Sequence, residues 1–108
     1  AWTVYNGGFS VGIQKISGIV PSDFALYQNY PNPFNSMTKI KLEVAIDKFV
    51  KLVVFDLLGR ELKTLVNESL QLGTYSVVWN ASNQASGIYF YKLEAGNFIQ
   101  TRKMILMK

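Results

Sequence analysis

The chain has 108 residues, of which 49% are hydrophobic and 17% are charged, and it contains neither cysteine nor histidine. This length suits one domain with a substantial apolar core. The missing residue types exclude thiol nucleophiles, imidazole bases and the usual ligands of zinc, iron–sulfur and haem sites, so we expect a non-enzymatic contact domain without cofactor or metal.

The charge of the chain gives a weaker constraint. Eleven lysine and arginine residues against seven acidic ones give a net charge of +4. The basic residues are spread along the sequence, whereas a nucleic-acid-binding protein usually gathers them on one element, so we expect no nucleic-acid partner. No apolar run approaches the length of a membrane span, and we expect no transmembrane segment.

Residues 1–20 predict two short strands on either side of Gly7-Gly8. We place them outside the main domain, as an N-terminal strand or linker that either ends a preceding domain or acts as a donor strand. If the 108 residues were the complete mature chain, this strand would insert beside an edge strand of the next identical subunit and build a head-to-tail filament. The apolar side chains that such a donor strand would bury are Trp2, Val4, Phe9, Val11 and Ile13.

Residues 21–108 are dominated by alternation with a period of two, which predicts β-strands. In 38–44, Ile40, Leu42 and Val44 share one face, as in a half-buried antiparallel strand. Residues 49–56 are apolar on both faces, with Lys51 as the exception, and predict a central strand that needs cover on both sides. The remaining predicted strands are 23–29, 61–66, 74–79, 88–94 and 98–107.

About seven short strands with frequent turns predict an all-β fold. The expected architecture is an immunoglobulin-like antiparallel β-sandwich over residues 21–108, with the extra N-terminal strand or linker in front of it. A closed β-barrel of the same size is the competing fold.

Residues 30–35, Tyr-Pro-Asn-Pro-Phe-Asn, predict a stiff corner. Each proline fixes its own φ angle and favours an extended conformation in the residue before it. Asparagine side chains can bond the backbone groups that have no partner in a ladder, and Phe34 is available as an apolar plug. We interpret this segment as a structural crossover whose rigid exposed surface also suits recognition.

Three acidic residues, Asp23, Asp47 and Asp56, fall at the ends of predicted strands. A paired acid and base at such positions would suit a hydrolase, but aspartate at a strand boundary more often stabilises a turn. The oxygen-rich stretch 80–83 has no neighbouring carboxylate, so we do not expect a calcium site there.

Three aromatic residues, Trp79, Tyr89 and Tyr91, suggest a third class of function. On an exposed face they would stack on sugar rings and make the domain a carbohydrate-binding module. Their alternation with polar neighbours favours packing in the core instead.

Four segments, in order, carry a resemblance to a known family. They are FALYQNYPNPFN (24–35), LVVFDLLGRELKTLVN (52–67), GTYSVVWNASNQASGIYFYKLEAGNF (73–98) and QTRKMILMK (100–108). Over about residues 21–108 the chain resembles the type A C-terminal sorting domain of the type IX (Por) secretion system. That family is also similar to the immunoglobulin-like domain of flagellar hook-capping proteins.

The resemblance implies a non-enzymatic module that directs a protein across the outer membrane to the cell surface or the extracellular space. The implied partner is the secretion machinery of the outer membrane, which often cleaves the domain from its cargo. The subunit of an extracellular filament, joined by the N-terminal donor strand, remains the alternative.

The resemblance also implies which residues belong to the sorting motif. Ser36 stands where many family members have a third proline, which we expect to relax the corner slightly. The residues that match the family pattern are Pro31, Asn32, Pro33, Phe34, Asn35, Gly59, Gly73, Gly87, Lys103 and Lys108.

Overall fold

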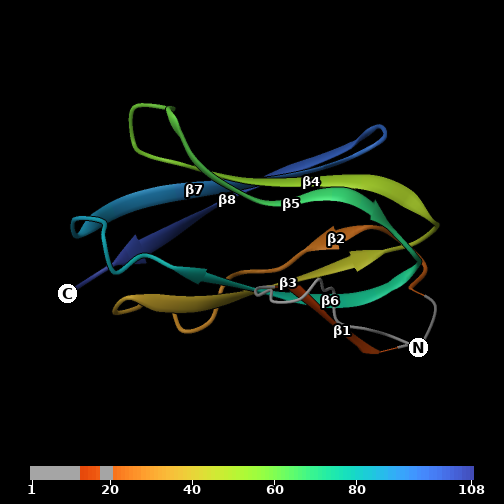
Figure 1. The fold of residues 1–108 in the computed structure, drawn as a ribbon, viewed down its shortest axis with the longest axis horizontal. Coiled ribbons are helices and arrows are strands. Elements are labelled where there is room, and N and C mark those ends of the chain that lie inside the picture. The colour runs from red at the N-terminus through yellow and green to blue at the C-terminus, as the bar shows by residue number, and fades with distance from the viewer. Residues whose placement is uncertain (1–12, 18–20) are drawn as a thin grey trace.

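Two four-stranded sheets lie face to face in the computed structural model, which describes residues 13–17 and 21–108 (Figure 1). The first sheet has the order β1-β6-β3-β2, formed by β1 (Ile13–Ser17), β6 (Gly73–Asn80), β3 (Met37–Val44) and β2 (Ala25–Leu26). The second has the order β5-β4-β7-β8, formed by β5 (Glu61–Leu70), β4 (Lys48–Phe55), β7 (Gly87–Ala95) and β8 (Phe98–Leu106).

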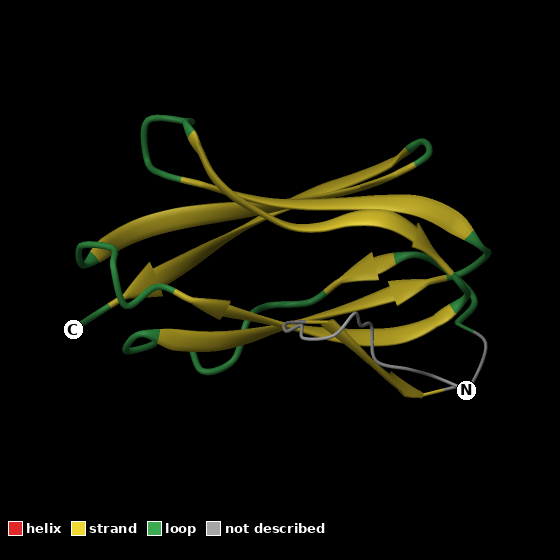
Figure 2. Cartoon of the chain, in the orientation of Figure 1, coloured by secondary structure: helices red, strands yellow, loops and turns green. Residues whose placement is uncertain are grey.

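Every regular element of the described residues is a strand (Figure 2). Neighbouring strands in both sheets pair antiparallel. The predicted all-β sandwich is therefore confirmed, and the competing barrel is wrong because the strands divide into two separate ladders. Within the described part of the chain there is no helix of the length and hydropathy needed to cross a membrane.

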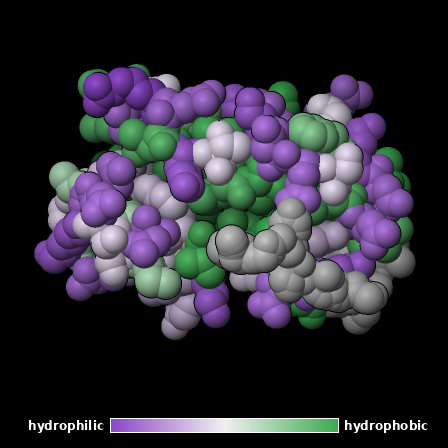
Figure 3. All heavy atoms as spheres, in the orientation of Figure 1, coloured by the Kyte–Doolittle hydropathy of each residue, from purple (hydrophilic) through white to green (hydrophobic). Residues whose placement is uncertain are grey.

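The core lies between the two sheets and follows from the alternation in the sequence. In β3, Ile40 and Leu42 are completely buried while the intervening Lys41 is exposed. Across the gap, Leu52 of β4 and Leu93 of β7 are also completely buried. Figure 3 shows apolar atoms gathered in the middle of this view, with mostly hydrophilic atoms above them.

Strand β4 has the central position that its sequence predicts, because it lies between β5 and β7 in the second sheet. Its inner residues Val50, Leu52 and Val54 are fully buried. The expected cover on the second face is incomplete in the described structure, since Phe49 on that face is 54% exposed.

Two strands differ in length from the prediction. Strand β5 continues to Leu70, beyond the predicted 61–66, because two irregularities in its pairing with β4 disturb the alternation and polar residues occupy 67–69. Strand β2 contains only two residues of the predicted 23–29. It ends early because the chain then turns the side chain of Asn29 into the interior, where it is 2% exposed.

Strand β1 lies within the residues that we assigned to an N-terminal strand or linker. It pairs with β6 of the same chain, with Ile13 opposite Val77, and so forms one edge of the first sheet. The domain boundary at residue 20 stays a prediction, but residues 13–17 add a strand to the sandwich.

The inner and outer faces of β4 should respond differently to truncation. Leu52→Ala is expected to lower the free energy of unfolding by about 2–5 kcal/mol, because it leaves a cavity in a fully buried site. Phe49→Ala is the matched control and should cost less than about 1 kcal/mol, because that side chain is already half in water. Urea unfolding of both variants measures the difference, and equal losses would contradict this assignment of faces.

Candidate recognition surface at the proline corner

The corner segment, which we define as residues 28–36, crosses from the first sheet to the second and back. It leaves β2, runs beside the outer edge of β8 and then enters β3 (Figure 1). The N–H of Phe34 donates to the carbonyl of Ile105 at 2.9 Å, and the carbonyl of Phe34 accepts from the N–H of Met107 at 2.8 Å. The corner segment thus adds a short parallel bridge to an edge that would otherwise lack a neighbour.

Two side chains of the corner segment extend this contact along β8. Asn32 Oδ1 accepts from the N–H of Ile105 at 3.0 Å, and Gln28 Nε2 donates to the carbonyl of Lys103 at 2.7 Å. Because an open strand edge is a template for unwanted pairing, this segment both joins and protects the last strand.

The side chain of Phe34 packs into the hydrophobic core, as the sequence predicts. It is 2% exposed, and its ring centroid lies 5.8 Å from that of Trp79. Trp79 in turn makes an edge contact with Tyr89 at 5.5 Å. Trp79, Tyr89 and Tyr91 are all buried, so the interpretation of these aromatics as core residues is confirmed and a sugar-stacking face made of them is wrong.

Asn29 organises the corner and was missed by the sequence analysis. Its N–H donates to Tyr91 Oη at 2.8 Å, and its Nδ2 donates to Thr38 Oγ1 at 3.0 Å and to the carbonyl of Pro31 at 3.1 Å. The only sequence signal was an asparagine just ahead of the proline segment. Nothing in that position distinguishes a buried asparagine from an exposed one in a turn.

Tyr91 links this network to the second sheet. Its hydroxyl donates to the carbonyl of Tyr27 at 2.7 Å while its oxygen accepts from Asn29. Burial raises the pKa of Tyr91 to about 12, although the hydrogen bond from Asn29 and the charge of Arg102 act in the opposite direction. Arg102 itself donates from Nε to the carbonyl of Leu26 at 2.6 Å, which gives a second polar link between the sheets.

Removal of the Tyr91 hydroxyl should reveal its contribution through a pH dependence. At pH 7, Tyr91→Phe is expected to cost about 1–3 kcal/mol, because buried groups of Asn29 and Tyr27 lose their partner. The folded protein keeps the phenol proton until about pH 12, whereas an unfolded chain releases it near pH 10. Wild-type stability from this group therefore falls as the pH rises between these values.

Urea unfolding of wild type and Tyr91→Phe across this range measures the effect, and the difference between the two proteins should shrink with rising pH. Tyr30→Phe is the matched control at pH 7, because the Tyr30 side chain is 79% exposed and the change should stay within about 0.5 kcal/mol. A constant difference between wild type and Tyr91→Phe would contradict the link between its burial and its proton.

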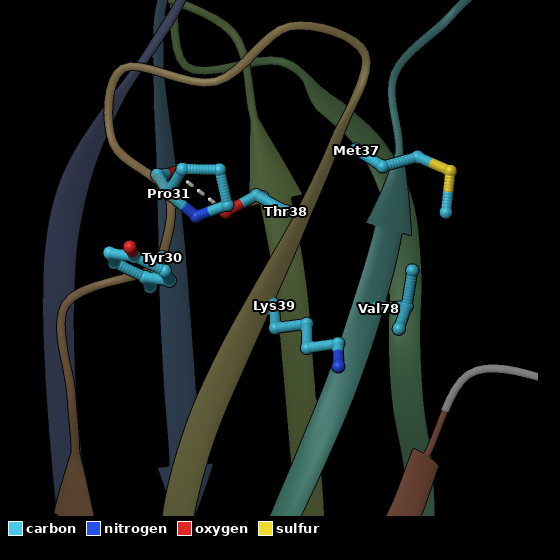
Figure 4. A pocket seen from close by; sticks show the side chains of 6 residues that line it. All are labelled: Tyr30, Pro31, Met37, Thr38, Lys39 and Val78. Carbon is cyan, nitrogen blue, oxygen red and sulfur yellow. Dashed lines mark hydrogen bonds between the residues drawn. The ribbon is translucent and has the colours of Figure 1, made fainter.

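A shallow groove of about 280 Å³ lies between the corner segment and the outer face of the first sheet. Figure 4 shows the chain arching over β3, with Tyr30 and Pro31 on one side and Met37 and Val78 on the other. Thr38 Oγ1 donates to the carbonyl of Pro31 at 2.9 Å and fixes the base of the arch. The lining is mostly apolar with the amino group of Lys39 beside it, which suits contact with an extended chain rather than acid–base chemistry.

The predicted motif residues are only partly brought together. Pro31, Asn32, Pro33 and Asn35 are exposed on the corner segment. Lys108 lies at the same end of the sandwich, where its Nζ donates to the carbonyl of Ser82 at 2.7 Å and its N–H donates to Ser86 Oγ at 3.0 Å. The side chain of Lys103 lies on the outer face of β8, away from this end group.

The three glycines of the predicted motif do not form one site. Gly87 begins β7 opposite Leu106 and lies near the corner. Gly59 occupies the β4–β5 turn at the other edge of the second sheet, where its φ of +85° explains the need for glycine. Gly73 begins β6 opposite Val44, at the far end of the sandwich.

The carboxylates at strand ends stabilise turns. Asp56 accepts hydrogen bonds from the N–H groups of Arg60 and Leu58, and the bond from the Arg60 backbone is the main reason that its pKa is lowered. Asp47 accepts from the N–H of Leu72 at 2.9 Å. The contacts of Asp56 confirm the expected turn chemistry, whereas Asp47 joins the β3–β4 turn to the β5–β6 turn and Asp23 lies exposed ahead of β2.

The proposed donor strand is described only in part. Ile13 is buried against its own chain in β1, while Trp2, Val4, Phe9 and Val11 lie outside the described residues. The described residues therefore give the filament alternative no support.

Ser36 has a backbone conformation that the sequence analysis did not anticipate. Its φ is +77°, in the left-handed region, and its carbonyl accepts from the N–H of Ala81 at 2.6 Å. Because proline is locked near −65°, a third proline does not fit this backbone, and the serine does more than relax the corner slightly.

Two substitutions at Ser36 should therefore act in opposite directions. Ser36→Gly is expected to raise the free energy of unfolding by up to about 1 kcal/mol, because glycine adopts positive φ without steric cost. Ser36→Pro is expected to lower it by more than about 1 kcal/mol. Thermal and urea unfolding measure both, and a proline variant as stable as wild type would mean that residue 36 has negative φ.

Comparison with known proteins finds one family whose model covers most of the sandwich. The family model described as the secretion system C-terminal sorting domain matches residues 28–107. No curated protein and no solved structure matches the chain. The match begins at Gln28 and ends at Met107, and both residues take part in the hydrogen bonds that join the corner segment to the C-terminal part of the chain.

Proposed function

Because the chain belongs to the secretion system C-terminal sorting domain family, we propose that residues 21–108 direct the protein that carries them across the outer membrane through the type IX system. Proteins with this domain are secreted to the cell surface or the extracellular space. The family acts as a sorting signal and not as a catalyst, and its partner is the type IX machinery.

One observation carries this proposal. The residues at which the family match begins and ends are hydrogen-bonded to each other's segments in the folded domain. The corner segment and β8 are about seventy residues apart in sequence, yet three hydrogen bonds join them and a fourth joins the corner to Met107, the residue after β8. Asn32 and Asn35 of the corner segment and Lys108, just after β8, are exposed at one end of the sandwich. We propose that the machinery recognises this end as one composite surface.

A surface made of two distant segments exists only in the folded domain. The corner reaches its observed position only when the last strand is in place, because Phe34 and Asn32 both bond Ile105. Recognition of this surface would therefore select chains whose sorting domain has folded.

Export of a fusion protein tests the proposal. All 108 residues, joined behind a periplasmic reporter in a host with the type IX system, should carry the reporter out of the cell. Retention of this fusion in the periplasm would contradict the sorting role. A second fusion of residues 21–108 tests the domain boundary, and its export would show that β1 is not needed.

The composite surface is tested by the double substitution Asn35→Ala and Lys108→Ala. We expect the secreted fraction to fall several-fold while the urea midpoint stays within experimental error, because both side chains are exposed. Asn97→Ala, an exposed asparagine in the β7–β8 turn at the opposite end, is the matched control. Equal losses in both variants would argue against recognition at the corner.

A further inference from the structure

The outer faces of the two sheets differ in chemistry. On the first sheet, outward positions of β3 and β6 are mostly polar, with Lys41, Glu43 and Ser76 among them. On the second sheet, Phe55 of β4 lies directly opposite Phe90 of β7. The second sheet thus has aromatic side chains at outward positions, whereas the first sheet has mostly charged and hydroxyl groups at its outward positions.

The apolar character continues along the three strands β4, β7 and β8. Ile88 lies opposite Ile105, and Val53 on the same outer face is only 3% exposed because its neighbours cover it. Ile99 is 62% exposed at the margin. A sandwich strand normally alternates apolar residues inward with polar residues outward, so this face departs from the rule.

No third layer of the described chain lies over this face (Figure 1). Apolar patches of this kind on a protein surface commonly mark a site of contact with a partner. The sequence of β4 already required cover on both faces, and the described structure supplies it on one.

Three lysines are interspersed with the apolar side chains of this face and bear on the charge of its partner. Lys51, Lys92 and Lys103 occupy outward positions on the three strands. Glu94 is the one carboxylate at the outward positions of these described strands, and it pairs with Lys92 at 3.0 Å. Lys92 Nζ also lies 5.4 Å from the ring centroid of Phe55. On the neighbouring β5, Glu61 lies opposite Phe55 on the same outer face. Three lysines against two carboxylates still leave this face with a positive charge, which favours an acidic partner.

The shape of the face favours a protein over a lipid surface. Val53, Phe55 and Phe90 are buried or half-buried in the sheet, and of its apolar side chains only Ile99 and Phe49 at its margins are more than half exposed. Insertion into a membrane interface needs apolar side chains that reach into the acyl region. Charged side chains alternate with apolar ones across this face, and such a mixed surface suits a protein partner better than the acyl region of a lipid layer.

We propose that the outer face of β4, β7 and β8 is a docking surface for a protein of the outer-membrane machinery whose own surface combines apolar and acidic side chains. This inference rests on the proposed sorting function and adds a second contact to it. The corner segment is at one end of the sandwich, whereas this surface covers one side.

A charge-reversing double variant, Lys51→Glu with Ile99→Gln, tests the surface. Both residues lie in one cross-strand row with Glu94. The matched control, Lys41→Glu with Ile46→Gln, makes the same chemical changes away from this face, at a lysine of the first sheet and at an isoleucine that is 55% exposed. Circular dichroism and urea unfolding should show that both proteins are folded.

Binding is measured for the full 108-residue chain on two probes. These are outer-membrane vesicles from a strain with the type IX system and protein-free liposomes made from the lipids of those vesicles. We expect wild type to bind the vesicles and not the liposomes, with affinity that falls as salt increases. The double variant should bind the vesicles about tenfold more weakly, and the control within about twofold of wild type.

Several results would overturn the docking surface: no binding of wild type to vesicles, equal binding to liposomes, or equal affinity of wild type and double variant. Export of the reporter fusion separates this proposal from the sorting function. A wild-type fusion that stays in the periplasm defeats the sorting role. Export of the wild-type and double-variant fusions at the same level defeats only the docking surface.

Discussion

The hydrogen bonds of the corner segment to both sheets are the constraint on which the rest of this domain depends. Tyr30 exchanges backbone bonds with Lys39 of the first sheet, and four residues later Phe34 does so with Ile105 and Met107 at the edge of the second. A sandwich held by apolar packing alone leaves the relative position of its sheets weakly specified, because the hydrophobic effect has no direction. The corner fixes the relative position of the two sheets, because it is hydrogen-bonded to both of them within a short length of chain.

The polar groups around the corner make this arrangement specific. Asn29, Thr38 and Tyr91 are buried, and each has hydrogen-bond partners on a different part of the chain. Inside a protein an unpaired polar group is costly, so a shifted corner would leave several of these groups unsatisfied at once. The network therefore connects the correct position of the proline segment to the stability of the whole domain.

The sequence predicted the parts of the structure that depend on local alternation, and it missed those that depend on distant contacts. The central place of β4 and the burial of Phe34 follow from apolar character alone. The burial of Asn29 requires Tyr91, which is sixty-two residues away, and the positive φ of Ser36 depends on how the chain enters β3. The extra length of β5 was hidden by pairing irregularities that interrupt the period of two. For the site, the corner was predicted, but its union with β8 was not, because pairing between separate segments leaves no periodic signal.

Strand β8 connects the two surfaces proposed for this domain. At Lys103 the carbonyl group accepts the bond from Gln28 of the corner segment, while the side chain belongs to the outer face beside Phe90. A strand directs its backbone bonds sideways and its side chains up and down, so one strand can serve an edge contact and a face contact together. The last strand thus fixes the corner through its backbone and presents a basic, apolar face through its side chains. Loss of this strand would remove both surfaces at once, whereas substitutions on its outer face would affect only one.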